Sequence, residues 1–200
     1  MIYVVSGPSG CGKSTLIKRV LTRLEGVRFS VSHTTRARRA SEINGKDYYF
    51  VSPNRFLGLV KRNAFVEWAV VHGAYYGTSK RELSKGRSDD IILDIDVQGA
   101  AQVKKKIRAA VFIFVLPPTF RELRKRIEER GSNSAADIRK RLATARKEVR
   151  SYSAFDYVVV NDDLETAARD LESIVLCRRA RLAARKKSLG PILKTFRAKG

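Results

Sequence analysis

An eight-residue stretch close to the start of the sequence has the residue types and the spacing that bind a polyphosphate. Two glycines separated by four residues, and then Lys and Ser, form the phosphate-binding loop pattern, and the stretch reads Gly7-Pro8-Ser9-Gly10-Cys11-Gly12-Lys13-Ser14. Glycine at the tight positions lets backbone N–H groups approach phosphate oxygens, because no Cβ holds the anion away. Lys13 is expected to reach the outer phosphates, and the Ser14 hydroxyl to bind Mg²⁺. The stretch therefore predicts a nucleoside triphosphate site.

The segments on either side of this loop support that interpretation. The apolar run 2–5 before it is typical of a buried strand, and after it apolar residues recur at helical spacing: Leu16, Ile17, Val20, Leu21 and Leu24. A helix that begins at the loop adds unpaired N–H donors and partial positive charge to an anion site. A chance glycine-rich turn, which is the alternative, would have no reason to stand between a strand and a helix.

Beyond the loop, apolar runs alternate with helical patterns along most of the chain. Buried strands are expected at 29–32, 91–96, 111–116 and 157–160. This alternation predicts an α/β protein with a parallel, doubly wound central sheet and right-handed crossovers.

The segment 32–78 breaks the alternation. It contains a tight turn that leads into a strand (44–51), a helix that begins at Ser52-Pro53 with Ser52 as its cap and Pro53 as its first residue, a strand at 65–71 and an expected turn at 73–78. An inserted lobe of mixed α/β structure is therefore expected here.

The last third of the chain contains helices and a basic end. Thr119 and Glu122 have the spacing of a capping box, in front of a helix expected to turn Phe120, Leu123 and Ile127 inward. A polar break follows at 131–137, and a further helix after it. The last strand is followed by a helix that starts at 161–163. After Glu172 the chain has nine Lys and Arg and no acidic residue, so the tail is expected to be a solvated helix end and a mobile segment.

Composition limits the possible partners. The 200 residues carry 41 Lys and Arg against 20 Asp and Glu, a net charge of +21, which favours anionic partners. Two cysteines, Cys11 and Cys177, make neither a disulfide framework nor a metal site, and no signal peptide pattern opens the sequence. The apolar run 109–116 is too short to span a bilayer. A cytoplasmic protein without a membrane partner is expected.

Several separate motifs, in this order, make nearly the whole chain resemble a guanylate kinase of the P-loop nucleoside monophosphate kinase family. They are the loop 6–14, Ser32-His33-Thr34-Thr35-Arg36, Gly45-Lys46-Asp47-Tyr48, Glu67-Trp68-Ala69, Tyr75-Tyr76-Gly77-Thr78, Ile92-Leu93-Asp94-Ile95-Asp96 and Val160-Asn161-Asp162-Asp163. The resemblance implies a three-layer P-loop NTPase fold with an inserted lobe that binds GMP and a small helical lid. It implies a core of residues 1–31 and 79–190, a lid at about 126–148, a lobe at 32–78 and a basic tail at 191–200.

The resemblance also implies an acceptor site in the inserted lobe. The residues that would hold the 5′-phosphate of GMP are Ser32, Arg36, Arg39, Tyr48 and Tyr76, and those that would read guanine are Glu67, Thr78 and Asp94. The chemistry agrees, because guanine presents adjacent N1–H and N2–H donors that a carboxylate accepts in parallel. Adenine offers a lone pair at N1 and would leave Glu67 unpaired, which allows a discrimination of roughly 10⁴-fold or more.

For the donor side, the resemblance implies an ATP site and a set of cations. The ATP site would comprise residues 7–15, from Gly7 to Thr15, with Asn161 as an adenine-side contact. The positive charge for transfer would come from Lys13, Arg36, Arg39, Arg130 and Arg141, with Mg²⁺ on Ser14. Asp94 could serve Mg²⁺ through water, guanine, or both. The implied reaction moves the γ-phosphoryl group of ATP to GMP, and is expected to extend to dGMP, in purine nucleotide metabolism.

Other interpretations remain open for single residues and for the whole chain. The arginines could be solvated surface charges, the tyrosines could be core aromatics, and Glu67 an edge charge. The chain could be a non-catalytic module of similar fold, although the loop is intact, or a kinase of a phosphosugar. Nucleic acid is disfavoured because no recognition motif accompanies the positive charge. The oligomeric state and the resting position of the lid stay open.

Overall fold

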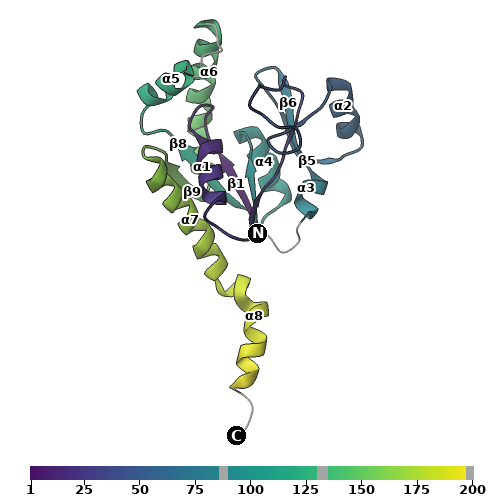
Figure 1. The fold of residues 1–200 in the computed structure, drawn as a ribbon, viewed down its shortest axis with the longest axis vertical. Coiled ribbons are helices and arrows are strands. Elements are labelled where there is room, and N and C mark those ends of the chain that lie inside the picture. Colours follow the sequence, from purple (N-terminus) through teal and green to yellow (C-terminus); the bar gives the residue numbers. More distant parts are fainter. Residues whose placement is uncertain (86–89, 130–134, 197–200) are drawn as a thin grey trace.

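The computed structural model describes residues 1–85, 90–129 and 135–196 of the chain. A five-stranded sheet forms its centre, in the order β2-β7-β1-β8-β9 (Figure 1). The strands are β1 (Ile2–Ser6), β2 (Val27–Phe29), β7 (Asp90–Asp94), β8 (Val111–Leu116) and β9 (Tyr157–Val160). All four neighbouring pairs are parallel, as the alternation of strands and helices predicted. Parallel strands end at one edge of the sheet, so the loops that follow β1 and β7 lie side by side.

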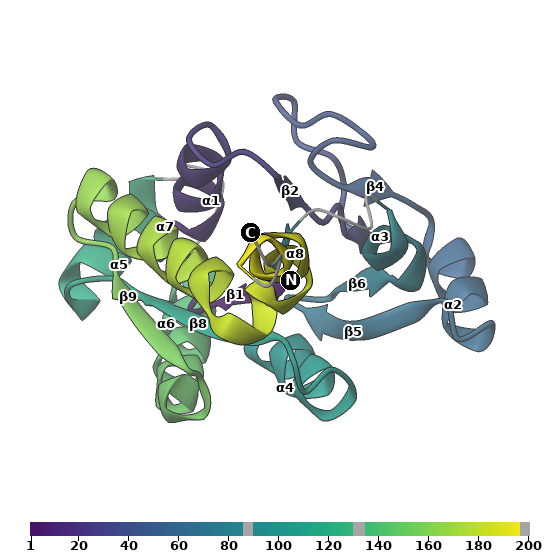
Figure 2. The same cartoon turned by 90° about the horizontal axis from the view of Figure 1, so that it is seen from below.

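Helices cover both faces of this sheet, which makes three layers (Figure 2). On one face, α1 (Lys13–Leu21) and α7 (Leu164–Ala180) pack over Tyr3 and Val5 of β1. On the other face, α4 (Val97–Lys106) packs over Val4. Successive β1 side chains therefore enter opposite cores, which is why the run 2–5 is apolar throughout rather than alternating.

A second, four-stranded sheet lies beside the first, in the order β4-β3-β6-β5 (Figure 2). Its elements are β3 (His33–Thr34), β4 (Tyr49–Phe50), α2 (Pro53–Lys61), β5 (Phe65–Val71) and β6 (Ala74–Ser79), followed by α3 (Lys80–Ser84). Phe56 of α2 is fully buried against the rings of Phe65 (4.6 Å) and Tyr75 (5.3 Å). The segment thus has an aromatic core of its own.

Two expectations for this region were wrong. The segment 73–78 is mostly the strand β6, and the turn is confined to His72 and Gly73, whose φ angles are 49° and 82°. Two residues with positive φ make the tight connection that suits antiparallel strands. The strand expected at 29–32 is instead β2, which ends at Phe29, and the chain then crosses to the second sheet at His33.

Two helices, α5 (Phe120–Glu129) and α6 (Ala135–Val149), rise beside the loop edge of the sheet, and the short 3-10 helix η1 (Arg150–Ala154) follows. Leu123 and Ile127 are buried against α6, as predicted, but Phe120 is 40 % exposed, with the guanidinium of Arg146 4.4 Å from its ring centroid. Thr119 does accept the N–H of Glu122, at 3.0 Å. The Glu122 carboxylate pairs with Arg126 of α5 at 2.8 Å, so the capping box is only half formed.

The basic end of the chain is more ordered than expected. After α7 a further helix, α8 (Leu182–Thr195), continues through Pro191 and points away from the rest of the protein (Figure 1). The boundary expected between residues 190 and 191 therefore lies inside a helix. Within the described ranges, none of the helices is long and apolar enough to cross a bilayer.

Candidate functional site

The loop between β1 and α1 has a backbone that only glycine adopts easily. Gly7, Gly10 and Gly12 have φ angles of 145°, 94° and 91°. A Cβ on Gly7 would lie 2.2 Å from the carbonyl oxygen of Val115, and one on Gly12 would lie 2.3 Å from the Asn161 side-chain nitrogen. The approach of a phosphate is the reason expected from the sequence for these glycines. The structure adds a second reason, because the neighbouring strand ends already fill the space.

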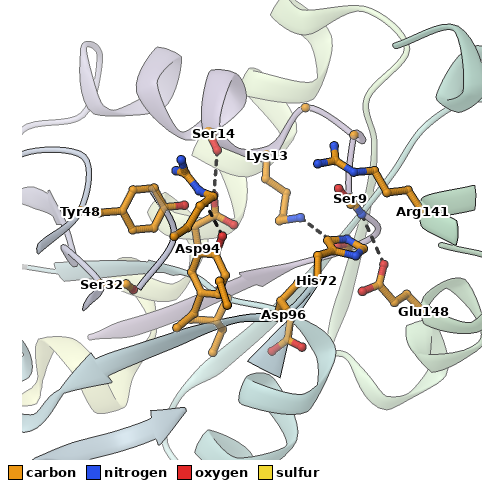
Figure 3. Close-up of a pocket in the computed structure, with 18 of the residues that line it drawn as sticks. Ser9, Lys13, Ser14, Ser32, Tyr48, His72, Asp94, Asp96, Arg141 and Glu148 are labelled. Atoms are coloured by element: carbon orange, nitrogen blue, oxygen red, sulfur yellow. Dashed lines mark hydrogen bonds between the residues drawn. The ribbon is translucent and has the colours of Figure 1, made fainter. Parts of the chain in front are cut away.

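Lys13, the first residue of α1, folds back over the loop. Its Nζ donates a hydrogen bond to the Gly7 carbonyl at 2.8 Å (Figure 3). Burial would lower the pKa of Lys13, but the sulfur of Cys11 and the carboxylates of Asp94 and Glu148 outweigh burial and raise it. The ammonium group is therefore fully charged at the mouth of the loop.

Ser14 and Asp94 meet across the two adjacent strand ends. Ser14 Oγ donates to Asp94 Oδ2 at 2.9 Å, although the two residues are 80 positions apart in the chain. A hydroxyl and a carboxylate are hard oxygen donors, and Mg²⁺ in phosphate sites takes only one or two such protein ligands beside the phosphates. The pair therefore fits the cation that the loop pattern predicted. Asp96, two residues on, instead caps α4 by accepting the Gly99 N–H at 2.9 Å.

Glu148, near the end of α6, contributes a carboxylate that sequence reasoning missed. Its Oε2 accepts the Ser9 N–H at 3.3 Å (Figure 3), so it occupies one of the loop donors. Burial raises the pKa of Glu148, and the positive charge of Lys13 opposes this only in part. Nothing in the local sequence signals the contact, because Ser9 and Glu148 are 139 residues apart.

In the second sheet, a buried carboxylate faces a small polar cluster. Glu67 of β5 is 3 % exposed, and its Oε1 accepts the backbone N–H of Thr78 in the neighbouring strand β6 at 2.8 Å. The Thr78 hydroxyl is 3.5 Å from that of Ser32, and both side chains are buried. Three residues predicted to bind GMP are thus brought together.

The environment of Glu67 disfavours the charged form of its carboxyl group, relative to a carboxyl group in water. Burial is the main cause, and it raises the pKa of Glu67 to about 7 although hydrogen bonds from Thr78 act in the opposite direction. A carboxylate that is costly to ionise in isolation gains from any ligand that supplies N–H donors.

Arg36 and Arg39 lie at the other end of this lobe, around a second carboxylate that sequence reasoning missed. Arg36 pairs with Glu42 at 2.7 Å and donates from Nε to the Tyr76 hydroxyl at 3.2 Å. The Arg39 guanidinium is 54 % exposed and 3.9 Å from Glu42. Burial opposes ionisation of Glu42, but the two arginines outweigh it and lower its pKa. Glu42 is only six positions from Arg36, and the density of arginine between them was the available signal.

The two tyrosines predicted for the site pack together. The Tyr48 and Tyr76 rings are 6.0 Å apart, edge to face, and the Arg36 guanidinium carbon is 5.5 Å from the Tyr48 centroid. Burial raises the pKa of Tyr48, so its hydroxyl stays protonated and available as a donor.

One cavity of about 290 Å³ joins the loop to this lobe. The expected site residues that line it are Gly7, Ser9, Gly10, Gly12, Lys13, Ser14, Ser32, Arg36, Arg39, Tyr48, Glu67, Tyr76, Asp94 and Arg141. Arg141 reaches it from α6, and the exposed His72 lines it from the β5–β6 turn (Figure 3). Arg130, the other arginine expected in the lid, lies outside the described residues.

Pro8, Cys11, Thr15, Thr78 and Asn161 do not line this cavity. Thr15 and Asn161 line a second cavity, of about 350 Å³, together with Arg126 and with Gly10 and Gly12 of the loop. The Asn161 amide donates to the Cys11 carbonyl at 2.8 Å, so it supports the loop as well as facing this cavity. The Cys11 thiol is buried, and burial raises its pKa, which makes it a small filler rather than a reactive group.

Known proteins are similar to this chain in sequence and in overall fold. Residues 1–177 match the protein family described as guanylate kinase. The chain is 49 % identical to a guanylate kinase of Neisseria gonorrhoeae, over 88 % of each chain, and 45 % identical to one of Geobacter metallireducens, over 90 % of each. The crystal structure of the Anaplasma phagocytophilum guanylate kinase superposes with a TM-score of 0.76 at 35 % identity, covering 90 % of this chain and 87 % of that one.

The loop geometry, the parallel sheet and these similarities over most of the chain lead to one conclusion: the protein belongs to the guanylate kinase family and is by descent a nucleoside monophosphate kinase.

Proposed function

We propose that the protein transfers the γ-phosphoryl group of MgATP to GMP, and to dGMP, giving ADP and GDP. One observation carries the proposal: a single cavity is lined both by the phosphate-binding loop and by Arg36, Tyr76 and Glu67 of the lobe. A donor held in the loop and an acceptor held in the lobe would share that space. Such positioning is the main requirement of phosphoryl transfer.

In this scheme residues 32–78 form the acceptor lobe and residues 126–148 the lid. Arg36 and Arg39 would break their ion pairs with Glu42 and bind the 5′-phosphate of GMP instead. The hydroxyls of Tyr48 and Tyr76 would be further donors. Glu67 would accept the N1–H and N2–H of guanine, beside Ser32 and Thr78. Asp94 lies between the two halves and is assigned to Mg²⁺ through its pairing with Ser14.

On the donor side, Lys13 and Arg141 would neutralise charge on the transferring group. Ser14 and Asp94 would hold Mg²⁺, which would withdraw negative charge from the transferring phosphoryl group. A phosphate acceptor is largely ionised at neutral pH, so no general base is needed. The second cavity, at Thr15 and Asn161, is proposed for the adenosine part of ATP.

The direct test is to mix the protein with MgATP and each nucleoside monophosphate in turn and to follow ADP release. GMP is expected to be the preferred acceptor. Equal activity on AMP or on a sugar phosphate would contradict the proposed specificity for GMP.

Since the chain carries two free cysteines, Cys11 and Cys177, a cytoplasmic location stays our prediction.

Affinity for GMP is expected to fall as the pH is lowered through the pKa of Glu67, about 7. Below that pH the carboxyl is protonated and loses acceptor capacity, so KM for GMP should rise roughly tenfold per pH unit at the acid limit. Steady-state kinetics from pH 8 to pH 6 measure this.

The phosphate of GMP also titrates near pH 6 and needs its own control. The Glu67→Gln variant keeps the phosphate site but has no carboxyl to titrate, so its residual pH dependence reports the phosphate alone. Identical profiles for parent and variant would show that Glu67 is not the titrating group.

Glu148→Gln is expected to tighten MgATP binding by about tenfold, which corresponds to roughly 1.4 kcal/mol. The parent carboxylate and an incoming phosphate compete for the same Ser9 N–H and repel each other, whereas the amide has no charge. Calorimetry with a non-hydrolysable ATP analogue measures the change. Glu128→Gln on the exposed face of α5 is the matched control. Weaker binding by the Glu148 variant would show that the carboxylate supports the loop instead.

A further inference from the structure

Gly99 lies in α4, where the backbone conformation does not require glycine. It is the third residue of the helix, it is buried, and its φ lies outside the positive range that favours glycine. Glycine in a helix destabilises it relative to alanine, because the unfolded chain loses more freedom on folding. A reason for glycine must therefore come from what surrounds it.

The surrounding group is the carboxylate of Glu67. A Cβ on Gly99 would lie 2.5 Å from Glu67 Oε2 and 3.2 Å from its Cδ, with Asp96 Oδ1 also at 3.2 Å. The other oxygen, Oε1, is held by the Thr78 N–H at 2.8 Å. Glu67 is 3 % exposed and its carboxylate lines the cavity, so the methyl group would displace the carboxylate toward the space proposed for guanine. A methyl group at residue 99 would push the carboxylate out of its place.

This close approach sets Gly99 apart from other helical glycines. Around Gly58 in α2 and Gly190 in α8, no described atom lies within 4 Å of the place that a methyl group would take. In both places alanine would fit and should stabilise the helix. α4 packs along β5, the strand that carries Glu67, so the missing side chain at residue 99 lies at the contact between core and lobe.

We propose that Gly99 is a specificity-determining positioning residue, whose missing side chain makes the space in which the Glu67 carboxylate is held for guanine. The proposal rests on the function proposed above, in which Glu67 reads the base. Two parallel hydrogen bonds to N1–H and N2–H require both carboxylate oxygens at fixed positions. Displacing one oxygen breaks that alignment without touching the phosphate-binding loop.

The test compares Gly99→Ala with Gly58→Ala as a matched helical control. Gly99→Ala should raise KM for GMP about tenfold to a hundredfold, the effect of losing one hydrogen bond to a charged group. KM for ATP should stay within twofold. The preference for GMP over IMP, which lacks the N2 amine, should shrink by a similar factor. Gly58→Ala should change none of these and raise the melting temperature.

A double-mutant cycle distinguishes the proposed role of Gly99 from the proposed role of Glu67 in recognising guanine. In a Glu67→Ala background the 2.5 Å contact is gone and the new methyl group meets only the 3.2 Å approach of Asp96 Oδ1, so Gly99→Ala should have little further effect on KM for GMP. If Gly99→Ala alone fails to fold, the double variant should fold; if it too fails, the proposal is wrong. An unchanged KM for GMP in Gly99→Ala, with Glu67→Ala still losing guanine preference, overturns the role of Gly99 alone. Retained preference in Glu67→Ala overturns the proposed reader itself.

Discussion

Glu67→Ala is expected to abolish the preference for GMP over AMP while leaving MgATP binding unchanged. The parent carboxylate is buried, its pKa is raised to about 7, and it accepts hydrogen bonds from Thr78, whose backbone N–H lies 2.8 Å from Oε1. Guanine would supply two donors to it, whereas adenine would leave it desolvated and unpaired. A site that depends on buried hydrogen bonds discriminates by about 10⁴-fold, so the ratio of kcat/KM values should fall by that order.

The measurement is a set of kcat/KM values for GMP, IMP and AMP, with ATP affinity measured separately. Glu67→Gln is the informative companion, because it keeps the shape but turns one acceptor into an N–H₂ donor that faces the donors of guanine. It should lose most of the preference. If Glu67→Ala chooses among bases as the parent does, guanine is read elsewhere.

Lys13→Met is expected to lower kcat by about 10³-fold or more while the fold persists. The Lys13 ammonium lies at the mouth of the loop, hydrogen-bonded to the Gly7 carbonyl, and its pKa is raised by the neighbouring sulfur and carboxylates. Methionine keeps most of the side-chain volume but removes the only charge that this side chain contributes to the transferring phosphoryl group. Loss of one preorganised charge of this kind costs about 10²- to 10³-fold, and a cation at the γ-phosphate up to 10⁵-fold.

The same variant makes a second, independent readout available. Without the positive charge of Lys13, the pKa of Glu148, which burial already raises, should rise further. Lys125→Met on α5, where the side chain is 66 % exposed, is the control and should keep kcat within twofold. A Lys13→Met protein that retains a tenth of the parent activity would contradict the assigned role.

Helices and strands that depend on interactions between residues close in sequence could be predicted from local patterns. The run 111–116 became β8, and Ser52 with Pro53 starts α2 with the predicted cap, because a strand buried on both faces and a capped helix are set by consecutive residues. The prediction that Phe120 is buried was wrong. Helical spacing identifies the apolar face of a helix, but it does not show which residues at the end of the helix are covered by a neighbouring element. The helix α8 was missed because the tail was interpreted from its charge, as a solvated helix end and a mobile segment.

The candidate site divides in the same way. The loop 7–14 could be recognised from the spacing of its glycines alone. Glycine has no Cβ, so the glycine positions determine where the loop backbone can approach a phosphate or a neighbouring strand closely. Glu148 could not be recognised in this way, since its importance comes from a contact with Ser9, 139 positions away, that only the fold creates. Glu42 is six positions from Arg36, and its local signal, the density of arginine, was not used. Asn161 was assigned to adenine alone, and its hydrogen bond to the Cys11 carbonyl became visible only in three dimensions.

The amino-acid sequence by itself determined the phosphate loop, the parallel sheet that presents it and the family to which the protein belongs. Each of these follows from short-range rules: missing Cβ atoms, apolar runs and caps. The tertiary structure alone decided that Glu67 lies against Gly99 and that Glu148 reaches the loop. Those contacts join residues 32 and 139 positions apart, and only packing of the second sheet and of α6 beside the central sheet brings Glu67 and Glu148 to one cavity.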